Sequence, residues 1–224
     1  MSPVRLGVFC LALALVACAS GPPTPQWQVN AKSSLDRAVA AYLAGDTRTA
    51  TAEAEQARGE IARTGRIDLL ARAELMLCAA KVASLVFEPC EGFEKLRIDA
   101  AAPERAYADY LGARIQPDAV ALLPSAQRDV AAKAASEAAV GAVKGIDDPL
   151  SRLVGAGVLF QSGKANPGLL SLAVETASAQ GWRRPLLAWL GAQRMGAEKA
   201  GDTGAAERLR RRIDVIEQTL GPVK

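Results

Sequence analysis

The chain has 224 residues, of which 50% are apolar, 4% aromatic and 23% charged, and its formal net charge is +3. It contains no histidine, which excludes Ser-His-Asp and Cys-His nucleophiles and every zinc or haem site with a histidine ligand. The small net charge, spread along the chain, indicates no nucleic-acid partner. Because the alanine-rich composition with few aromatic residues favours helices over strands, we expect an all-α protein.

The first 17 residues have the composition of an export signal. A single cation, Arg5, precedes an apolar run at 6–17, as in the charged and hydrophobic regions of a secretory signal peptide. The alternative is a transmembrane anchor. That alternative needs a longer run, because a helix of this length rises only about 18 Å against roughly 30 Å of bilayer hydrocarbon. We therefore predict that residues 1–17 are removed.

A cysteine follows the apolar run, and the stretch Leu15-Val16-Ala17-Cys18 resembles the lipobox of bacterial lipoproteins. The resemblance implies cleavage before Cys18 and attachment of diacylglycerol to its sulfur, with acyl chains such as palmitate. A buried, non-lipidated cysteine is the alternative. Ala19 and Ser20 follow, instead of the aspartate that retains such proteins in the inner membrane of enteric bacteria. The resemblance thus implies a lipid anchor in the outer membrane, on its periplasmic face.

The next segment, 18–30, reads as the lipidated cysteine and a tether. Prolines 22, 23 and 25 disfavour a helix there, so we expect a semi-extended linker of about 3.1 Å per residue. Trp27 has two interpretations, contact with the membrane interface or packing as the first aromatic residue of the core. A single all-helical domain is predicted at 31–221.

The sequence of the domain predicts a succession of helices, because no stretch shows sustained alternation of apolar and polar residues with a period of two. Asp148 and Asn166 each stand before a proline as helix N-caps, whereas Gly181 and Gly201 mark helix ends. Helices are predicted at 31–44, 47–63, 67–86, 103–113, 125–144, 149–161, 167–180, 184–199 and 203–219.

Two segments that join predicted helices share a sequence. Ala44-Gly45-Asp46-Thr47 and Ala200-Gly201-Asp202-Thr203 are each followed by an alanine three residues further on. The glycine ends one helix, Asp or Thr caps the next, and the alanine lets the two helices approach closely. These segments resemble the inter-helix turn of tetratricopeptide repeats, which implies stacked helical hairpins at 31–64 and 150–219. An unrelated helical bundle is the alternative.

Cys78 and Cys90 are the two cysteines of the predicted domain. If the helix that holds Cys78 ends near Val86, Cys78 lies about 12 Å back along its axis. The four residues from there to Cys90 can span about 13 Å when extended. A disulfide is therefore within reach, is typical of exported proteins, and would contribute about 2–3 kcal/mol. Two buried free thiols are the alternative.

Two further sets of residues are candidates for binding. Trp182 and Trp189 share one helical face with leucines 186 and 190. Such a stripe is most often core, and the alternative is that it lines a concave groove for a partner. Arg208, Arg210, Arg211 and Arg212 span just over one turn of the last predicted helix, so their charges spread around it. They read as solvated surface, or as a contact for an acidic partner or anionic headgroups.

No catalytic constellation, cofactor site or metal site is indicated, and the scattered carboxylates read as solvated helix faces. The leading hypothesis is a non-enzymatic, membrane-anchored helical scaffold of the bacterial cell envelope that binds another envelope protein. One alternative is a peptidoglycan-acting enzyme that uses a single buried glutamate as general acid. The other is a lipid-binding or small-ligand-binding module, which would need an enclosed apolar cavity.

Overall fold

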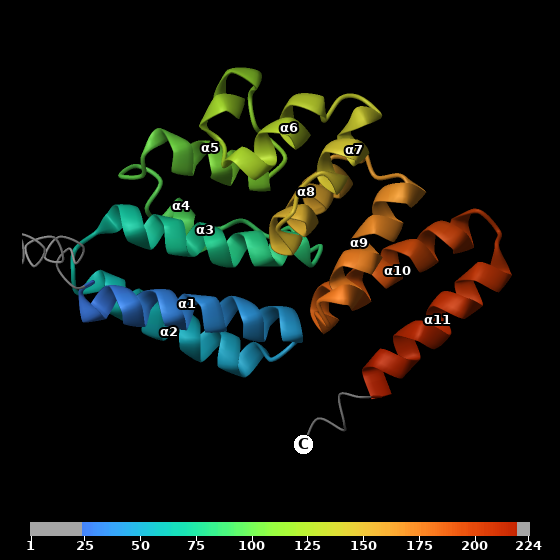
Figure 1. Cartoon of the computed structure of the whole chain (residues 1–224), viewed down its shortest axis with the longest axis horizontal. Helices are drawn as coiled ribbons and strands as arrows, with labels where there is room; N and C mark the ends of the chain where they lie inside the picture. The colour runs from blue at the N-terminus through green and yellow to red at the C-terminus, as the bar shows by residue number, and fades with distance from the viewer. Residues whose placement is uncertain (1–23, 219–224) are drawn as a thin grey trace, which may run out of the picture.

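The computed structural model describes residues 24–218, which form helices joined by turns, with no strand in that range (Figure 1). The prediction of an all-α protein is confirmed. The predicted export signal and Cys18 lie outside the described residues. The elements are α1 (Gln26–Ala44), α2 (Thr47–Ala62), α3 (Ile67–Ala83), α4 (Glu91–Glu94), α5 (Ala102–Leu111), the 3-10 helix η1 (Pro117–Leu122), α6 (Ser125–Lys133), α7 (Ala138–Lys144), α8 (Pro149–Gln161), α9 (Pro167–Ala179), α10 (Arg183–Lys199) and α11 (Thr203–Gln218).

Three predicted helices differ from the structure by more than two residues, and the short elements α4 and η1 were not among the predicted helices. α1 begins at Gln26, five residues before the predicted start, because the Pro25 carbonyl accepts the first helical hydrogen bonds and a proline there forfeits no helical N–H bond. α3 ends at Ala83, because Leu85 adopts a positive φ of 57°. The predicted helix at 125–144 is two helices, α6 and α7, with a break where the Ser136 hydroxyl donates to the Lys133 carbonyl.

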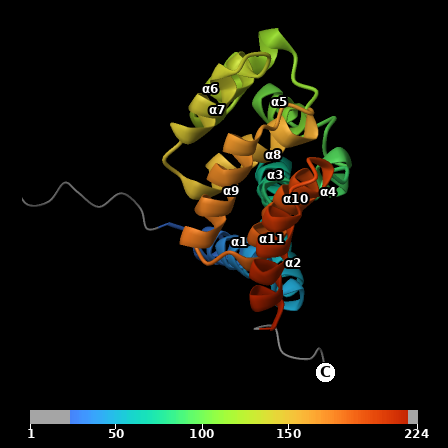
Figure 2. The same ribbon diagram turned by 90° about the vertical axis from the view of Figure 1, so that its right-hand side faces the viewer.

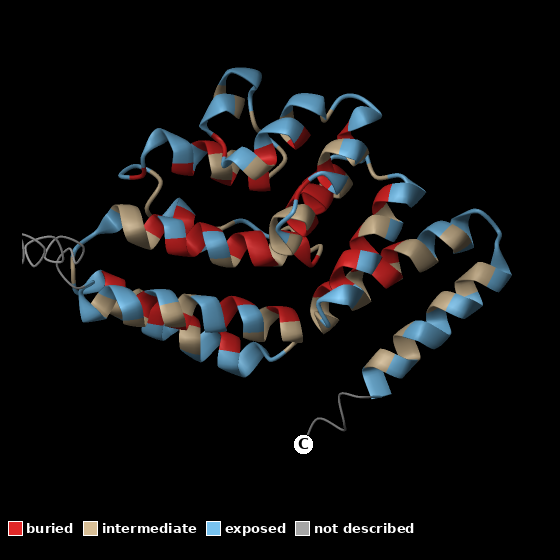
Figure 3. Cartoon of the chain, in the orientation of Figure 1, coloured by how far each residue is buried: buried red, intermediate tan, exposed pale blue. Residues whose placement is uncertain are grey.

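The helices pack in layers around α3. The antiparallel pair α1 and α2 lies on one side of α3, and α5 lies on the other (Figures 1 and 2). α8 packs against α3 and leads into α9, α10 and α11, which continue to the far end of the molecule. Figure 3 shows buried residues concentrated in α3, α8, α9 and the first part of α10. The largest fully buried side chains of this core include Leu111, Leu153, Leu159, Leu169 and Trp189.

The backbones of α3 and α8 touch where they cross. A Cβ atom placed on Gly157 would lie 2.4 Å from the Val82 carbonyl oxygen, so only glycine fits at this position. Nearby, the Trp189 indole Nε1 donates to the Ala83 carbonyl at 3.0 Å. The crossing therefore joins three helices, α3, α8 and α10.

A buried hydrogen-bond chain joins α5, α6 and α8. The Tyr110 hydroxyl donates to Gln127 Oε1 at 2.7 Å, and Gln127 Nε2 donates to the Ser151 carbonyl at 2.9 Å. Tyr110 and Gln127 are both fully buried. Since the side-chain polar atoms of Tyr110 and Gln127 are paired, these hydrogen bonds stabilise one relative placement of the three helices.

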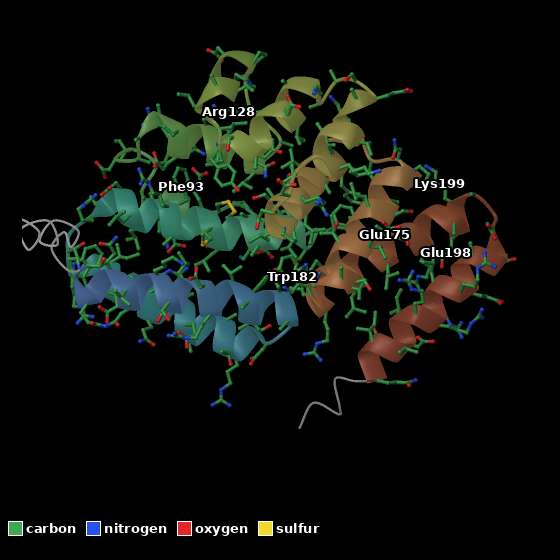
Figure 4. All side chains as sticks on the ribbon, in the orientation of Figure 1. Phe93, Arg128, Glu175, Trp182, Glu198 and Lys199 are labelled. Carbon is green, nitrogen blue, oxygen red and sulfur yellow. A yellow bond between two sulfur atoms is a disulfide. The ribbon has the colours of Figure 1, made fainter. Side chains whose placement is uncertain are left out.

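Cys78 and Cys90 form a disulfide with a Cα–Cα distance of 5.8 Å, which confirms the predicted pairing (Figure 4). It connects α3 to the residue that precedes α4.

The turn sequence that occurs twice in the chain has the same conformation in both places. Gly45 and Gly201 have φ values of 91° and 75°, and Asp46 and Asp202 each accept a hydrogen bond from the backbone N–H three residues later. Each turn joins two neighbouring helices, α1 to α2 and α10 to α11.

Candidate functional site

The tryptophan stripe belongs to the core. Trp189 is 0% exposed, and its ring meets Phe160 edge to face at a centroid distance of 5.6 Å. Trp182 is partly buried beside Tyr42 and Leu150, at the junction between the end of α1 and the start of α10 (Figure 4). The alternative that the stripe lines a groove is wrong for Trp189, because a fully buried side chain offers no surface to a partner.

Beside Trp182, two arginines bind the end of α1. Arg183 Nε donates to the Ala44 carbonyl at 2.9 Å, and Arg184 Nε donates to the Tyr42 carbonyl at 2.7 Å. The Arg184 guanidinium also lies 4.3 Å from the centroid of the Tyr42 ring. Cations are stabilising at the C-terminal end of a helix, where carbonyls lack helical partners. We call this set the α1–α10 junction.

The structure separates the four predicted arginines into two pairs. Arg208 and Arg212 line a groove, whereas Arg210 and Arg211 lie near acidic residues of their own helix, Asp214 at 4.0 Å and Glu207 at 3.9 Å. All four side chains are exposed. Among residues 24–218, neither Arg208 nor Arg212 has an ion pair or hydrogen bond from its side chain. Of the four predicted arginines, the two that line the groove are therefore the ones without an ion pair among the described residues.

The groove that they line, here the C-terminal groove, lies between α9, α10 and α11 and has a volume of about 600 Å³. Leu170 and Leu209 supply its larger apolar side chains, and Asp202 is the acidic residue in its lining. Because small residues make up much of the wall, another chain can approach closely. Those small residues are Gly196, Ala197, Ala200 and Ala205.

α11 is only partly covered by the rest of the domain. It contains no buried residue among 203–218, and Figure 3 shows it in the colours of exposed and intermediate residues. Val215 on α11 is 63% exposed and Met195 on α10 is 57% exposed. This hairpin thus presents apolar side chains and two arginines without ion pairs to the surroundings.

A second hollow, here the central cleft, lies between α3, α5, η1 and α8 and has a volume of about 700 Å³. Most of its lining is apolar, and Met76 and Leu122 are each 41% exposed. Glu104 also lines it and is 7% exposed, with Oε1 bound to Arg72 Nε at 2.6 Å. Burial raises the pKa of the neighbouring Tyr107, and the nearby Asp148 raises it further.

Sequence reasoning missed Glu104 and Arg72. A glutamate in the first turn of a helix is an ordinary stabilising residue, and nothing in the local sequence indicates that this one is buried. Its burial comes from the packing of α5 on α3, where Arg72 lies 32 residues earlier in the chain. Only knowledge of that helix pair could have identified the site.

The enzyme alternative requires a buried glutamate as general acid. Two glutamates are buried among the described residues, Glu74 and Glu104. Glu74 accepts from Arg58 Nε at 2.5 Å and from Arg58 Nη2 at 2.9 Å, and Glu104 accepts from Arg72. Each of the two buried glutamates is thus held by an arginine. Within residues 24–218 there is no group of three metal-ligating side chains placed to hold a metal ion.

Within the same range, no helix is long and apolar enough to cross a membrane. Comparison of the chain with protein-family models, with curated proteins and with solved structures finds no match.

Proposed function

We propose that this chain is a lipid-anchored helical scaffold on the periplasmic face of the bacterial outer membrane, where it binds another envelope protein. The C-terminal groove carries the proposal, because Arg208 and Arg212 line it beside small residues and lack ion pairs among residues 24–218. A guanidinium can bind a carboxylate through two parallel hydrogen bonds. The proposed partner segment therefore has acidic residues on one side and small apolar residues on the other.

The position of the groove supports a protein partner over lipid headgroups. α1 begins at the end of the molecule opposite to α11 (Figure 1). A lipid on Cys18, upstream of α1, would leave the C-terminal groove at the far end of the domain from its attachment. Arg208 and Arg212 would then meet a partner in the periplasm more readily than the anchoring membrane.

A relation to tetratricopeptide repeats is part of the proposal. Its support is the turn sequence shared by the α1–α2 and α10–α11 hairpins, together with the left-handed glycines and capping aspartates that both turns contain. Repeats of helical hairpins commonly offer extended surfaces to partner proteins. The α10–α11 hairpin supplies such a surface.

The enzyme alternative has less support than the scaffold. Glu74 and Glu104 are each held by an arginine, and the histidine that most often transfers protons at neutral pH is absent from the chain. The enzyme would replace the scaffold as the favoured function if the purified mature protein cleaved peptidoglycan and one Glu→Gln change abolished this cleavage.

The anchor is tested by Cys18→Ser. Serine cannot supply the thioether sulfur, so the variant should incorporate no alkyne-labelled palmitate in cells, whereas the unaltered chain should incorporate it. Incorporation that persists in Cys18→Ser would refute lipidation at this residue.

The partner is tested by photo-crosslinking in living cells, with the crosslinker at the exposed Met195 beside the groove and, as control, at Lys32 on α1. A protein crosslinked from Met195 alone is then purified for binding measurements. Arg208→Glu with Arg212→Glu should weaken its binding by about tenfold or more and reduce its salt dependence. Arg210→Glu with Arg211→Glu is the matched control, since it changes the same charge on the same helix outside the groove. Equal effects of the two double variants would refute the groove as the contact.

A further inference from the structure

Glu104, which lines the central cleft, has a buried carboxylate oxygen without a hydrogen-bond partner. Glu104 Oε1 is bound to Arg72, but Oε2 is shielded from solvent and accepts no hydrogen bond within the described residues. The side chain of Glu104 is 8% exposed, so it is more than nine-tenths buried. An unpaired buried acceptor is destabilising, and most native proteins pair such atoms.

The surroundings of Glu104 fit a small organic molecule. A volume of about 700 Å³ lies within the usual range of small-ligand sites, roughly 300–1,000 Å³. Met76 from α3 and Leu122 from η1 face this space while still 41% exposed. A ligand with an apolar body would remove both side chains from water, which favours its binding.

The charges of the lining indicate that the ligand is uncharged. Two cations, Arg72 and Arg128, and two anions, Glu104 and Asp148, line the cleft, so their formal charges cancel. Arg72 already supplies a positive charge to Glu104, and a second cation in the cleft would meet that guanidinium. A carboxylate oxygen accepts hydrogen bonds and donates none. A neutral N–H or O–H donor therefore matches the free oxygen.

We propose that the central cleft binds an uncharged, mostly apolar small molecule whose N–H or O–H group donates to Glu104 Oε2. The walls are largely pre-formed, because the buried chain from Tyr110 through Gln127 to Ser151 fixes α5, α6 and α8. Since Oε2 is shielded from solvent, the donor reaches it after a side-chain movement.

The site differs from the proposed scaffold surface. The C-terminal groove is lined by residues of α9, α10 and α11, and the central cleft by residues that precede α9. Loss of partner binding in the Arg208 and Arg212 double variant should leave the cleft unchanged. The two proposals can therefore fail separately.

The proposal is tested with four probes that share a short alkyl chain and differ in the head group: hexanamide, methyl hexanoate, hexanoate and hexylammonium. Binding to the mature protein is followed by backbone amide shifts of residues that line the cleft, including Tyr107 and Leu122. Hexanamide, the neutral donor, should bind about tenfold more tightly than methyl hexanoate, which only accepts. Both charged probes should bind more weakly than hexanamide.

Glu104→Gln removes the preference. The amide oxygen stays on Arg72, which only donates, and the amide NH₂ replaces Oε2. Since hexanamide and methyl hexanoate both carry a carbonyl that can accept from this NH₂, the tenfold advantage of hexanamide should be lost. Glu74→Gln is the matched control, since Glu74 is the other buried glutamate held by an arginine and does not line the central cleft. It should leave the order of the probes unchanged, and far-UV circular dichroism confirms that both variants fold.

Three results would overturn the proposal. One is that no probe shifts the cleft residues at millimolar concentration, which would leave Oε2 to ordered water. The second is equal binding of hexanamide and methyl hexanoate. The third is tighter binding of either charged probe than of hexanamide.

Discussion

The two helical hairpins at the ends of the domain share a turn sequence but differ in their surroundings. In the α1–α2 hairpin both helices contribute buried residues, among them Leu43 and Ile61, and α3 and α10 pack against it. In the α10–α11 hairpin, α10 reaches the core through Trp189, while α11 has no buried residue among 203–218. The same local chemistry thus builds one hairpin of the core and one that remains open.

This difference shows what local sequence decides and what packing decides. The turn, its left-handed glycine and its capping aspartate follow from four residues. Whether the second helix is covered depends on the helices that pack against it. α3 packs against α2, whereas among residues 24–218 α11 packs mainly against α10. A partly covered helix that carries arginines without ion pairs suits a partner from outside.

The largest contrast is expected from the leucines of the two hairpins. Leu43→Ala in α1 removes a side chain that is 1% exposed and should cost about 2–5 kcal/mol of unfolding free energy. Leu209→Ala in α11 removes a partly covered side chain and should cost about 1 kcal/mol or less. Urea unfolding of both variants measures the difference. Similar losses of unfolding free energy would mean that α11 packs as closely into the core as α1 does.

A smaller effect is expected from loosening the α1–α10 junction. Arg183→Ala with Arg184→Ala removes the side-chain donors to the Ala44 and Tyr42 carbonyls and should cost about 1–3 kcal/mol. Amide hydrogen exchange should accelerate in α1 and α2 but not in α11. Arg210→Ala serves as the control on exposed surface. Unchanged exchange in α1 would show that α3 alone holds the first hairpin.

A smaller and more local effect on amide hydrogen exchange is expected from the two equivalent helix N-caps, Asp46 and Asp202. Asp46→Ala and Asp202→Ala remove equivalent hydrogen bonds to Thr49 and Ala205. Both should speed exchange several-fold at the start of the following helix. Only Asp46→Ala should also lower the global urea midpoint, because α2 is part of the packed hairpin and α11 can fray alone. A lower global urea midpoint for Asp202→Ala would contradict the proposed difference between the two hairpins.

The smallest effect is a dependence on pH at the first turn. Hydrogen bonds from the side chain and backbone N–H of Thr49 lower the pKa of Asp46 below its usual 3.8. A lowered pKa means that the cap is fully present above pH 3.8 and is lost as the pH falls through the lower, folded-state pKa. The amide shift of Thr49, followed by NMR, should therefore titrate with a midpoint below 3.8 and not titrate in Asp46→Asn. A midpoint at or above 3.8 would contradict the hydrogen bonds.

The sequence predicts the helices best where their caps are local. α8 begins at Pro149 as predicted because Asp148 accepts from the Ser151 N–H, and α9 begins at Pro167 because Asn166 accepts from the Leu169 N–H. The start of α1 was missed because Pro25 offers no side-chain cap. The break between α6 and α7 was missed because alanine-rich sequence continues across it.

The candidate sites were predictable only in part. Cys78 and Cys90 lie 12 residues apart, so helix geometry alone brought the disulfide within reach. Which arginines face the C-terminal groove depends on how α11 packs on α10, and the periodicity of α11 cannot specify that. The burial of Glu104 depends on α3 in the same way. Local patterns identify elements, and only their packing creates clefts.

The α1–α10 junction also sets an order of events during synthesis. Arg183 and Ala44 lie 139 residues apart in the chain, so this contact closes a loop that spans most of the domain, and such closure carries a large entropic cost. The first hairpin leaves the ribosome early, yet the residues that secure its end are made almost last. A chain that stops before Arg183 would hold α1 and α2 only through α3, and the Tyr42 and Ala44 carbonyls would lack their arginine donors. The hairpin made first thus gains the contacts that secure its end only after α10 has begun to form.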